Sequence, residues 1–98
     1  MAAGDVSKII CGAIRSRHLL SFTYKDSTRT VAPYILGLDE KGVVTLSAVQ
    51  LSGGSGVGFR TYVVDAVSSL AVTDHRFFRT HPDYNPRDRL FTRILCQV

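Results

Sequence analysis

The spacing of apolar residues changes once along the chain, from a helical period to a strand period. Near the N-terminus they recur every three or four positions, which predicts an amphipathic helix over residues 5–17. Asp5 is a candidate N-cap, because its carboxylate can accept hydrogen bonds from the first backbone N–H groups of a helix. The face expected to pack on the rest of the protein carries Val6, Ile9, Ile10, Ala13 and Ile14.

Farther along, apolar and polar residues alternate, which is the pattern of half-buried strands. The first run extends from Leu20 to Tyr24, and Asp26-Ser27 is expected to form the turn after it. A glycine-rich segment at 52–56 lacks the Lys-Ser/Thr ending of a phosphate-binding loop and is interpreted as a hairpin loop. Further strands are predicted over residues 28–38, 43–51, 59–64 and 67–73.

The second of these strands contains Pro33, which cannot donate a backbone hydrogen bond and therefore indicates an edge or a bulge. Strict alternation places two sets of side chains on opposite faces of this strand. One set is Thr30, Ala32, Tyr34 and Leu36, and the other is Arg29, Val31, Pro33 and Ile35. In the next strand, alternation places Val44, Leu46 and Ala48 on one face.

One helix followed by five short antiparallel strands predicts a mainly β fold, a small closed or nearly closed barrel with the helix packed across it. The 98 residues are expected to form a single domain over 1–98. The barrel is predicted over about residues 19–73, a basic, turn-rich tail over 74–89 and a last strand over 90–98.

Composition places the protein among globular chains, with 45% hydrophobic and 20% charged residues. No apolar run has the roughly 20 residues of a membrane span, and the pattern of a secretory signal is absent. We therefore expect no membrane contact and a cytoplasmic location. Cys11 and Cys96 are far apart in the sequence and are expected to be buried, reduced thiols.

Charge is concentrated at the C-terminal end of the chain. The formal net charge is +4, and five arginines lie between His75 and the end. Arginine suits bidentate contact with phosphate, carboxylate or a base edge, but it is equally common on solvated surfaces.

Several motifs together resemble the WYL domain family. Leu20-Ser-Phe-Thr-Tyr24 followed by Arg29-Thr-Val-Ala-Pro33-Tyr-Ile-Leu36 resembles the opening of such a domain, and Arg60-Thr-Tyr-Val-Val-Asp-Ala-Val67 resembles a later segment. The similarity extends over about residues 6–78. Of the motif that gives the family its name, Leu46 matches, whereas Val44 and Thr45 stand in place of Trp and Tyr. Val63 and Ala66 stand where the family has arginine.

The resemblance implies an Src-homology-3-like, Sm-like barrel of the kind found in bacterial transcription regulators and in defence systems. It also implies that basic and aromatic residues of one barrel face sense a nucleotide or a single-stranded nucleic acid. The residues that carry this expectation here are Arg60, Arg29, Tyr24 and Tyr62.

Alternatives remain open for these residues and for the tail. Arg60 is expected either to bind a ligand phosphate or to pair internally with Asp65 or with a carbonyl group. Arg76, Arg79 and Phe78 are candidates for nucleic-acid contact, because cations interleaved with aromatic rings bind single strands. The alternative is that Phe77 and Phe78 hold the tail against the barrel while the arginines are solvated.

The sequence predicts no enzyme, cofactor or metal site, because it shows no paired carboxylates, nucleophile motif or metal-ligand spacing. We expect a non-catalytic regulatory or sensor module that binds an anionic ligand. The alternative is a structural module that associates with itself or with a regulator and binds no ligand. The β-prone segment 90–98 is expected to lie at the interface of a homodimer.

Overall fold

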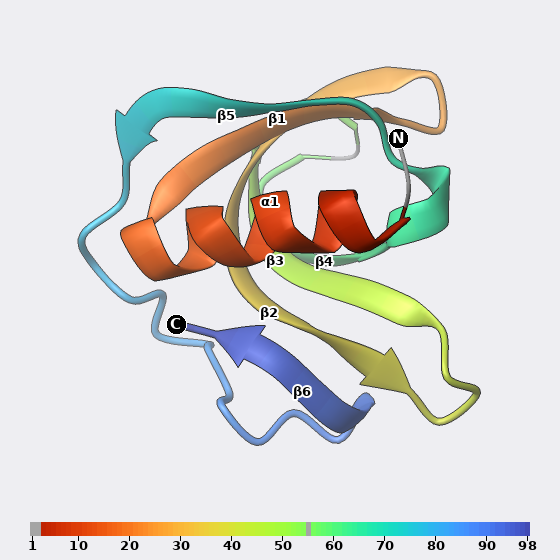
Figure 1. The fold of residues 1–98 in the computed structure, drawn as a ribbon. Helices are drawn as coiled ribbons and strands as arrows, with labels where there is room; N and C mark the ends of the chain where they lie inside the picture. Colours follow the sequence, from red (N-terminus) through yellow and green to blue (C-terminus); the bar gives the residue numbers. More distant parts are fainter. Residues whose placement is uncertain (1–2, 55) are drawn as a thin grey trace.

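The computed structural model describes residues 3–54 and 56–98, and in this part of the chain it contains one α-helix, six strands and a short 3₁₀ turn (Figure 1). In chain order these are α1 (Ala3–Ser16), β1 (His18–Tyr24), β2 (Ser27–Asp39), β3 (Val44–Ser52), β4 (Gly58–Val63), η1 (Val64–Ala66), β5 (Ser68–Arg76) and β6 (Phe91–Gln97). The mainly β fold with one N-terminal helix is confirmed.

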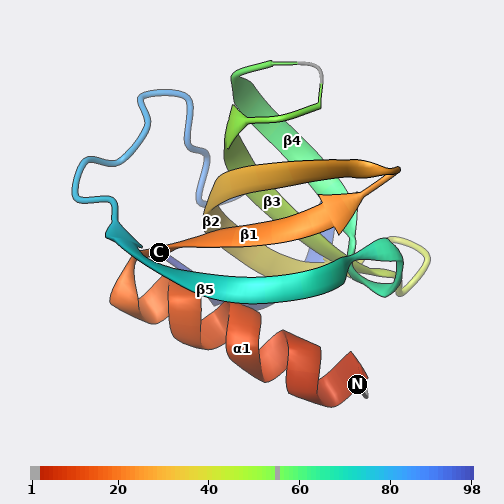
Figure 2. The same cartoon turned by 90° about the horizontal axis from the view of Figure 1, so that it is seen from above.

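The strands form one strongly curved antiparallel sheet in the order β4, β3, β2, β1, β5, and β6 joins it by pairing with β2 (Figures 1 and 2). β2 pairs with β3 on one side; on the other side it pairs first with β1 and then with β6. In the described part of the chain β4 and β5 do not pair. The sheet is therefore not closed, and β6, which was expected as a last strand outside the five-stranded barrel, is part of it.

The irregularity expected in β2 is present. The pairing of β2 with β3 shifts register between Pro33 and Ile35. As a result Val31 and Leu36 lie in the same core cluster, although strict alternation puts them on opposite faces. The face assignment for β2 is correct through Tyr34, which shares a cluster with Ala32, and wrong from Ile35 onward, because an irregularity of this kind inverts the phase of a strand.

Buried apolar side chains form two clusters. The larger one joins α1 to the sheet and contains the rings of Phe22, Tyr24 and Tyr62. The smaller one is centred on Tyr34, which is 2% exposed and stacks on Tyr84 from the segment that precedes β6. The single open sheet thus buries apolar side chains on both of its faces, with one cluster on each face.

The helix packs as expected, with two differences. Ile10, Ala13 and Ile14 are buried in the larger cluster, whereas Ile9 is only half-buried and does not belong to it. Asp5 lies inside the first turn rather than at the N-cap position, because α1 begins at Ala3. Its carboxylate is still close to the positive end of the helix dipole.

The predicted last strand is present as β6, and it pairs with the end of β2 of its own chain. Residues 74–76, expected in the tail, belong to β5. Residues 77–90, all described by the structure, contain no helix or strand and connect β5 to β6.

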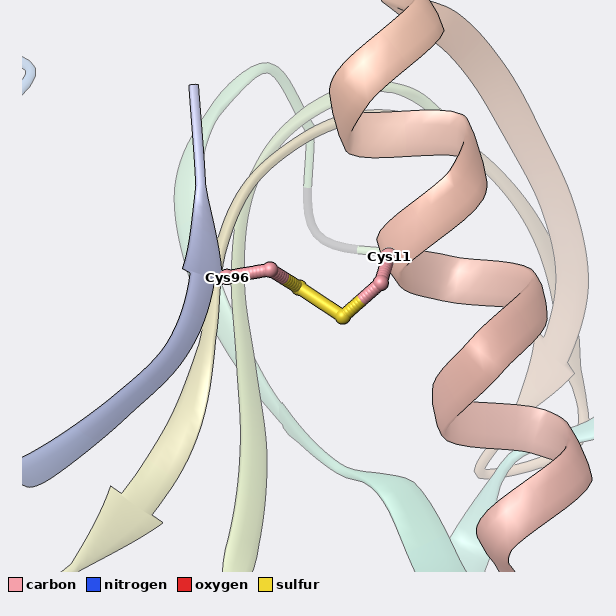
Figure 3. Close-up of a disulfide and its surroundings, with 2 residues drawn as sticks. All are labelled: Cys11 and Cys96. Atoms are coloured by element: carbon pink, nitrogen blue, oxygen red, sulfur yellow. A yellow bond between two sulfur atoms is a disulfide. The ribbon is translucent and has the colours of Figure 1, made fainter.

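Cys11 and Cys96 form a disulfide that links α1 to β6 (Figure 3). Their Cα atoms are 5.8 Å apart, although 85 positions separate them in the sequence. The expectation of two reduced thiols is therefore wrong. Sequence spacing does not show this pair, because the two residues meet only after β6 has paired with β2 beside the helix.

Reduction of this disulfide is expected to lower the free energy of unfolding by about 2–5 kcal/mol, because the bond closes a long loop and restricts the unfolded chain. Urea unfolding with and without dithiothreitol measures the effect. The double variant Cys11→Ser/Cys96→Ser is the control, because reductant has nothing to break in it. An unchanged unfolding midpoint in the reduced wild-type protein would contradict a stabilising role.

Candidate functional site

The four residues expected to bind a ligand, Tyr24, Arg29, Arg60 and Tyr62, come together around one pocket of about 500 Å³. We call it the arginine pocket. It lies between the turn that joins β1 to β2 and the end strand β4. Its full lining is Tyr24, Lys25, Ser27, Arg29, Gly54, Arg60, Thr61 and Tyr62.

One side of the pocket is built by a two-residue turn. Tyr24 pairs with Ser27, and both residues between them have left-handed backbone conformations, with φ of 50° at Lys25 and 62° at Asp26. Two consecutive left-handed residues define a type I′ turn, whose twist matches that of the flanking strands. The turn thus consists of Lys25 and Asp26 rather than of the expected Asp26-Ser27, and it places Lys25 at the pocket.

Arg29 is fixed in place by neighbouring groups. Its Nε donates to the backbone oxygen of Tyr24 at 3.2 Å, and its Nη1 donates to Oε1 of Gln50 at 3.0 Å. The guanidinium carbon lies 5.4 Å from the centre of the Tyr24 ring and 5.9 Å from that of Tyr62. Both rings are within the range of cation–π attraction, so the positive charge lies beside two aromatic side chains that also contact each other.

Gln50 organises this arrangement, and the sequence analysis did not single it out. It is completely buried, and its Oε1 accepts hydrogen bonds from both Arg29 and the Tyr62 hydroxyl, the latter at 2.7 Å. Its Nε2 donates to the backbone oxygens of Gly53 at 2.8 Å and Gly56 at 2.6 Å. The sequence does contain a signal for this role. Gln50 continues the alternation of Leu46 and Ala48 on the inward face of β3, and a polar residue at such a position needs buried partners.

The loop after β3 approaches Arg29 closely, and this approach requires glycine at position 54. A Cβ atom there would lie 2.6 Å from Nη1 of Arg29, and the backbone φ of +54° is itself unfavourable for other residues. The glycine-rich segment therefore does more than connect β3 to β4 as the expected hairpin loop. It also packs closely against Arg29.

The two tyrosines shape the pocket rather than offer open ring faces. Tyr62 is 1% exposed and Tyr24 is 8% exposed, and their rings meet edge to face. The Tyr24 hydroxyl accepts a hydrogen bond from the backbone N–H of Val63 at 3.1 Å. This bond ties the end of β1 to the outer edge of β4, where the sheet has no further strand.

Burial raises the pKa of Tyr62 above the ordinary tyrosine value of 10.0, although Arg29 and Arg60 act in the opposite direction. The hydroxyl therefore keeps its proton and donates it to Gln50. Burial likewise raises the pKa of Tyr84, with Tyr34 adding to the effect.

Arg60 lies on β4, and its Nη1 donates to the backbone oxygen of Phe59 at 2.8 Å. The internal carbonyl contact considered from the sequence is thus present. An ion pair with Asp65, the other internal alternative, is not formed between these two described residues.

The arginine pocket is strongly positive. Lys25, Arg29 and Arg60 line it, and the described residues of its lining include no Asp or Glu. Across residues 3–54 and 56–98 the structure shows one ion pair, between His81 and Asp83 at 4.0 Å, so no described carboxylate neutralises Lys25 or Arg29.

The candidate nucleic-acid residues of the tail lie elsewhere. Arg76 pairs with His18 at the opposite end of β1 from Tyr24, which separates the two groups by about 20 Å along the strand. The Arg76 guanidinium lies 5.2 Å from the ring centre of Phe78, which is 74% exposed. Phe77, in contrast, packs against Tyr34, as the alternative interpretation of the tail expects.

A comparison with family models, curated proteins and solved structures finds no significant match in any of the three. No group of three or more His, Cys, Asp or Glu in the described residues could hold a metal ion. The described part of the chain also has no helix of the length and apolarity needed to cross a membrane. The site must therefore be interpreted from its own geometry.

Stability is expected to decline as pH rises above 10.0, because unfolded Tyr62 then loses its proton while burial keeps the folded side chain protonated. The stabilisation that protonated Tyr62 contributes is complete below pH 10.0. It is lost as the pH rises through the raised pKa that Tyr62 has in the folded protein. Urea unfolding of wild type and Tyr62→Phe on both sides of pH 10.0 tests this. The variant should lose stability less steeply, and equal slopes would contradict the assignment.

Proposed function

We propose that this protein is a non-catalytic module that binds a small anionic ligand in the arginine pocket. The observation that carries the proposal is the charge of the lining, in which the residues described by the structure supply three cationic side chains and no carboxylate. Like charges held close together around a cavity raise the local concentration of anions. The best ligand is one that can accept hydrogen bonds from several guanidinium groups, such as a phosphate group.

Preorganisation supports the same conclusion. Arg29 is held by Gln50 and by the Tyr24 carbonyl group, so little side-chain freedom remains to be lost when a ligand binds. Gln50 in turn is satisfied by the loop carbonyls of Gly53 and Gly56. A pocket built in this way keeps its shape without a ligand.

The resemblance to WYL domains extends the proposal to a sensor role in bacterial transcription regulation or defence. Tyr24, Arg29 and Arg60, the positions carried over from that family, all line the pocket. Val63 and Ala66, which stand where the family has arginine, do not line it. We further propose that the curved sheet with its N-terminal helix is of the Src-homology-3-like, Sm-like type.

The disulfide bears on the compartment in which the protein works. Disulfides persist in oxidising environments and are rare in the cytosol. The cytoplasmic location expected from the sequence stays a prediction, and the Cys11–Cys96 bond weighs against it.

Titration of a nucleotide panel and of a labelled short single strand tests the proposal. Affinity is expected to fall steeply with added salt, because phosphate contacts are electrostatic. Arg60→Gln is expected to weaken binding by about tenfold or more, since a hydrogen bond to a charged group contributes about 1.5–3 kcal/mol.

Arg87→Gln is the matched control, because Arg87 is exposed and does not line the arginine pocket. The control should bind like the wild type. Absence of binding at every salt concentration would overturn the proposal and favour the structural module without a ligand.

The homodimer remains a prediction, now with a more specific geometry. In the described residues β6 pairs only with β2 of its own chain, and the disulfide keeps Cys96 there, so the outer edge of β6 is available to a second copy. Leu95, 40% exposed, adds apolar surface. Light scattering should show a dimer for the wild type and for Val72→Glu on β5, and a monomer for Leu95→Glu. A monomeric wild type contradicts the prediction.

A further inference from the structure

A second pocket lies next to the arginine pocket. It has a volume of about 620 Å³, and residues of the segment that connects β5 to β6 line it together with β4. We call it the tail pocket. Arg60 and Thr61 line both pockets. Because successive side chains of a strand point to opposite faces, the two pockets lie on the two faces of β4 and meet at its outer edge.

No strand in the described part of the chain covers that edge of β4. The N–H of Val63 points outward there, since it donates to the hydroxyl of Tyr24. Alternate residues of an antiparallel strand direct their backbone groups to the same side, so the backbone groups of Thr61 also face outward. The two pockets therefore adjoin along a polar edge, where Arg60 and Thr61 line both.

The two pockets differ in charge and in apolar surface. The arginine pocket is cationic, whereas the tail pocket is mixed: the carboxylates of Asp83 and Asp88 line it together with Arg60 and with His81, which lies 4.0 Å from Asp83. Asp83 is largely exposed, and Asp88 accepts a hydrogen bond from the backbone N–H of Leu90 at 3.0 Å. The half-buried rings of Phe59 and Tyr84 also line the tail pocket and give it flat apolar surface.

We infer that one ligand spans both pockets, with an anionic group in the arginine pocket and an uncharged, ring-containing part rich in hydroxyl groups in the tail pocket. Carboxylates accept hydrogen bonds from hydroxyl groups, and aromatic side chains pack on flat rings. A mononucleotide has this chemistry. The inference rests on the proposed function and makes it more specific.

The same charges disfavour a single strand of nucleic acid. Each nucleotide of a strand adds a phosphate, and a chain that continues from the arginine pocket into the tail pocket brings its next phosphate close to Asp83 and Asp88. Asp88 is half-buried, so its repulsion of a phosphate is screened less than that of the exposed Asp83. The ligand is therefore a small molecule with one charged end.

The test compares three probes: inorganic phosphate, a nucleoside 5′-monophosphate and a short single-stranded oligonucleotide. Calorimetric titration of the wild type is expected to show the mononucleotide binding about tenfold more tightly than inorganic phosphate, because the tail pocket adds hydrogen bonds. Asp83→Asn/Asp88→Asn should lose about three- to tenfold of that preference and bind the oligonucleotide more tightly.

Asp74→Asn is the matched control, since Asp74 is exposed, lies on β5 and lines neither pocket. Should the double variant fail to fold, as judged by circular dichroism, Asp83→Asn alone gives the answer, because its side chain is 81% exposed.

Equal affinities of the wild type for phosphate and mononucleotide, both lost in Arg60→Gln, would overturn this inference and leave the proposed function intact. Tighter binding of the oligonucleotide than of the mononucleotide would overturn it as well. If none of the probes binds, the proposed function fails and the inference fails with it.

Discussion

The register shift in β2 between Pro33 and Ile35 decides which side chains meet on each face of the sheet. Before the shift, β2 directs Val31 toward α1, and after it Leu36 takes over that role. β1 pairs with only the first part of β2, up to Val31, so the same side of β2 is open to β6 from Ile35 to Asp39. Close approach of β6 requires Gly37, where a Cβ atom would lie 2.5 Å from a backbone oxygen of β6. One bent strand thus organises two core clusters and three neighbouring strands.

The candidate site depends on a polar group inside the core. Gln50 has no exposed surface, and a buried amide without partners would destabilise the fold. Its side chain bonds Arg29 and Tyr62, which line the arginine pocket, and the loop after β3, which supplies Gly54 to the same pocket. Folding and the formation of the pocket are therefore the same event, which explains how the pocket can hold positive charges together without a bound anion.

Local pattern predicted the helix and every strand to within three residues, because period and turn residues are properties of neighbouring positions. The resemblance to WYL domains, rather than local pattern, suggested Arg29 and Arg60 as parts of one site, and both line the arginine pocket. What failed depended on tertiary contact. The Cys11–Cys96 bond needs β6 beside α1, and the inversion after Pro33 needs the actual pairing with β3. Tyr62, expected from the sequence to contact a ligand, lines the arginine pocket, but the sequence did not show that its ring would be buried beside Arg29.

The disulfide also determines how the molecule responds to mechanical force. Cys11 and Cys96 lie close to the two ends of the described chain and are covalently joined. A pull applied to the two ends is carried through this bond, so the sheet and both pockets between the cysteines bear no load. An unfolding enzyme that threads proteins from one end meets a loop closed by the disulfide between residues 85 positions apart. It must then pull two segments of the chain through its pore at once.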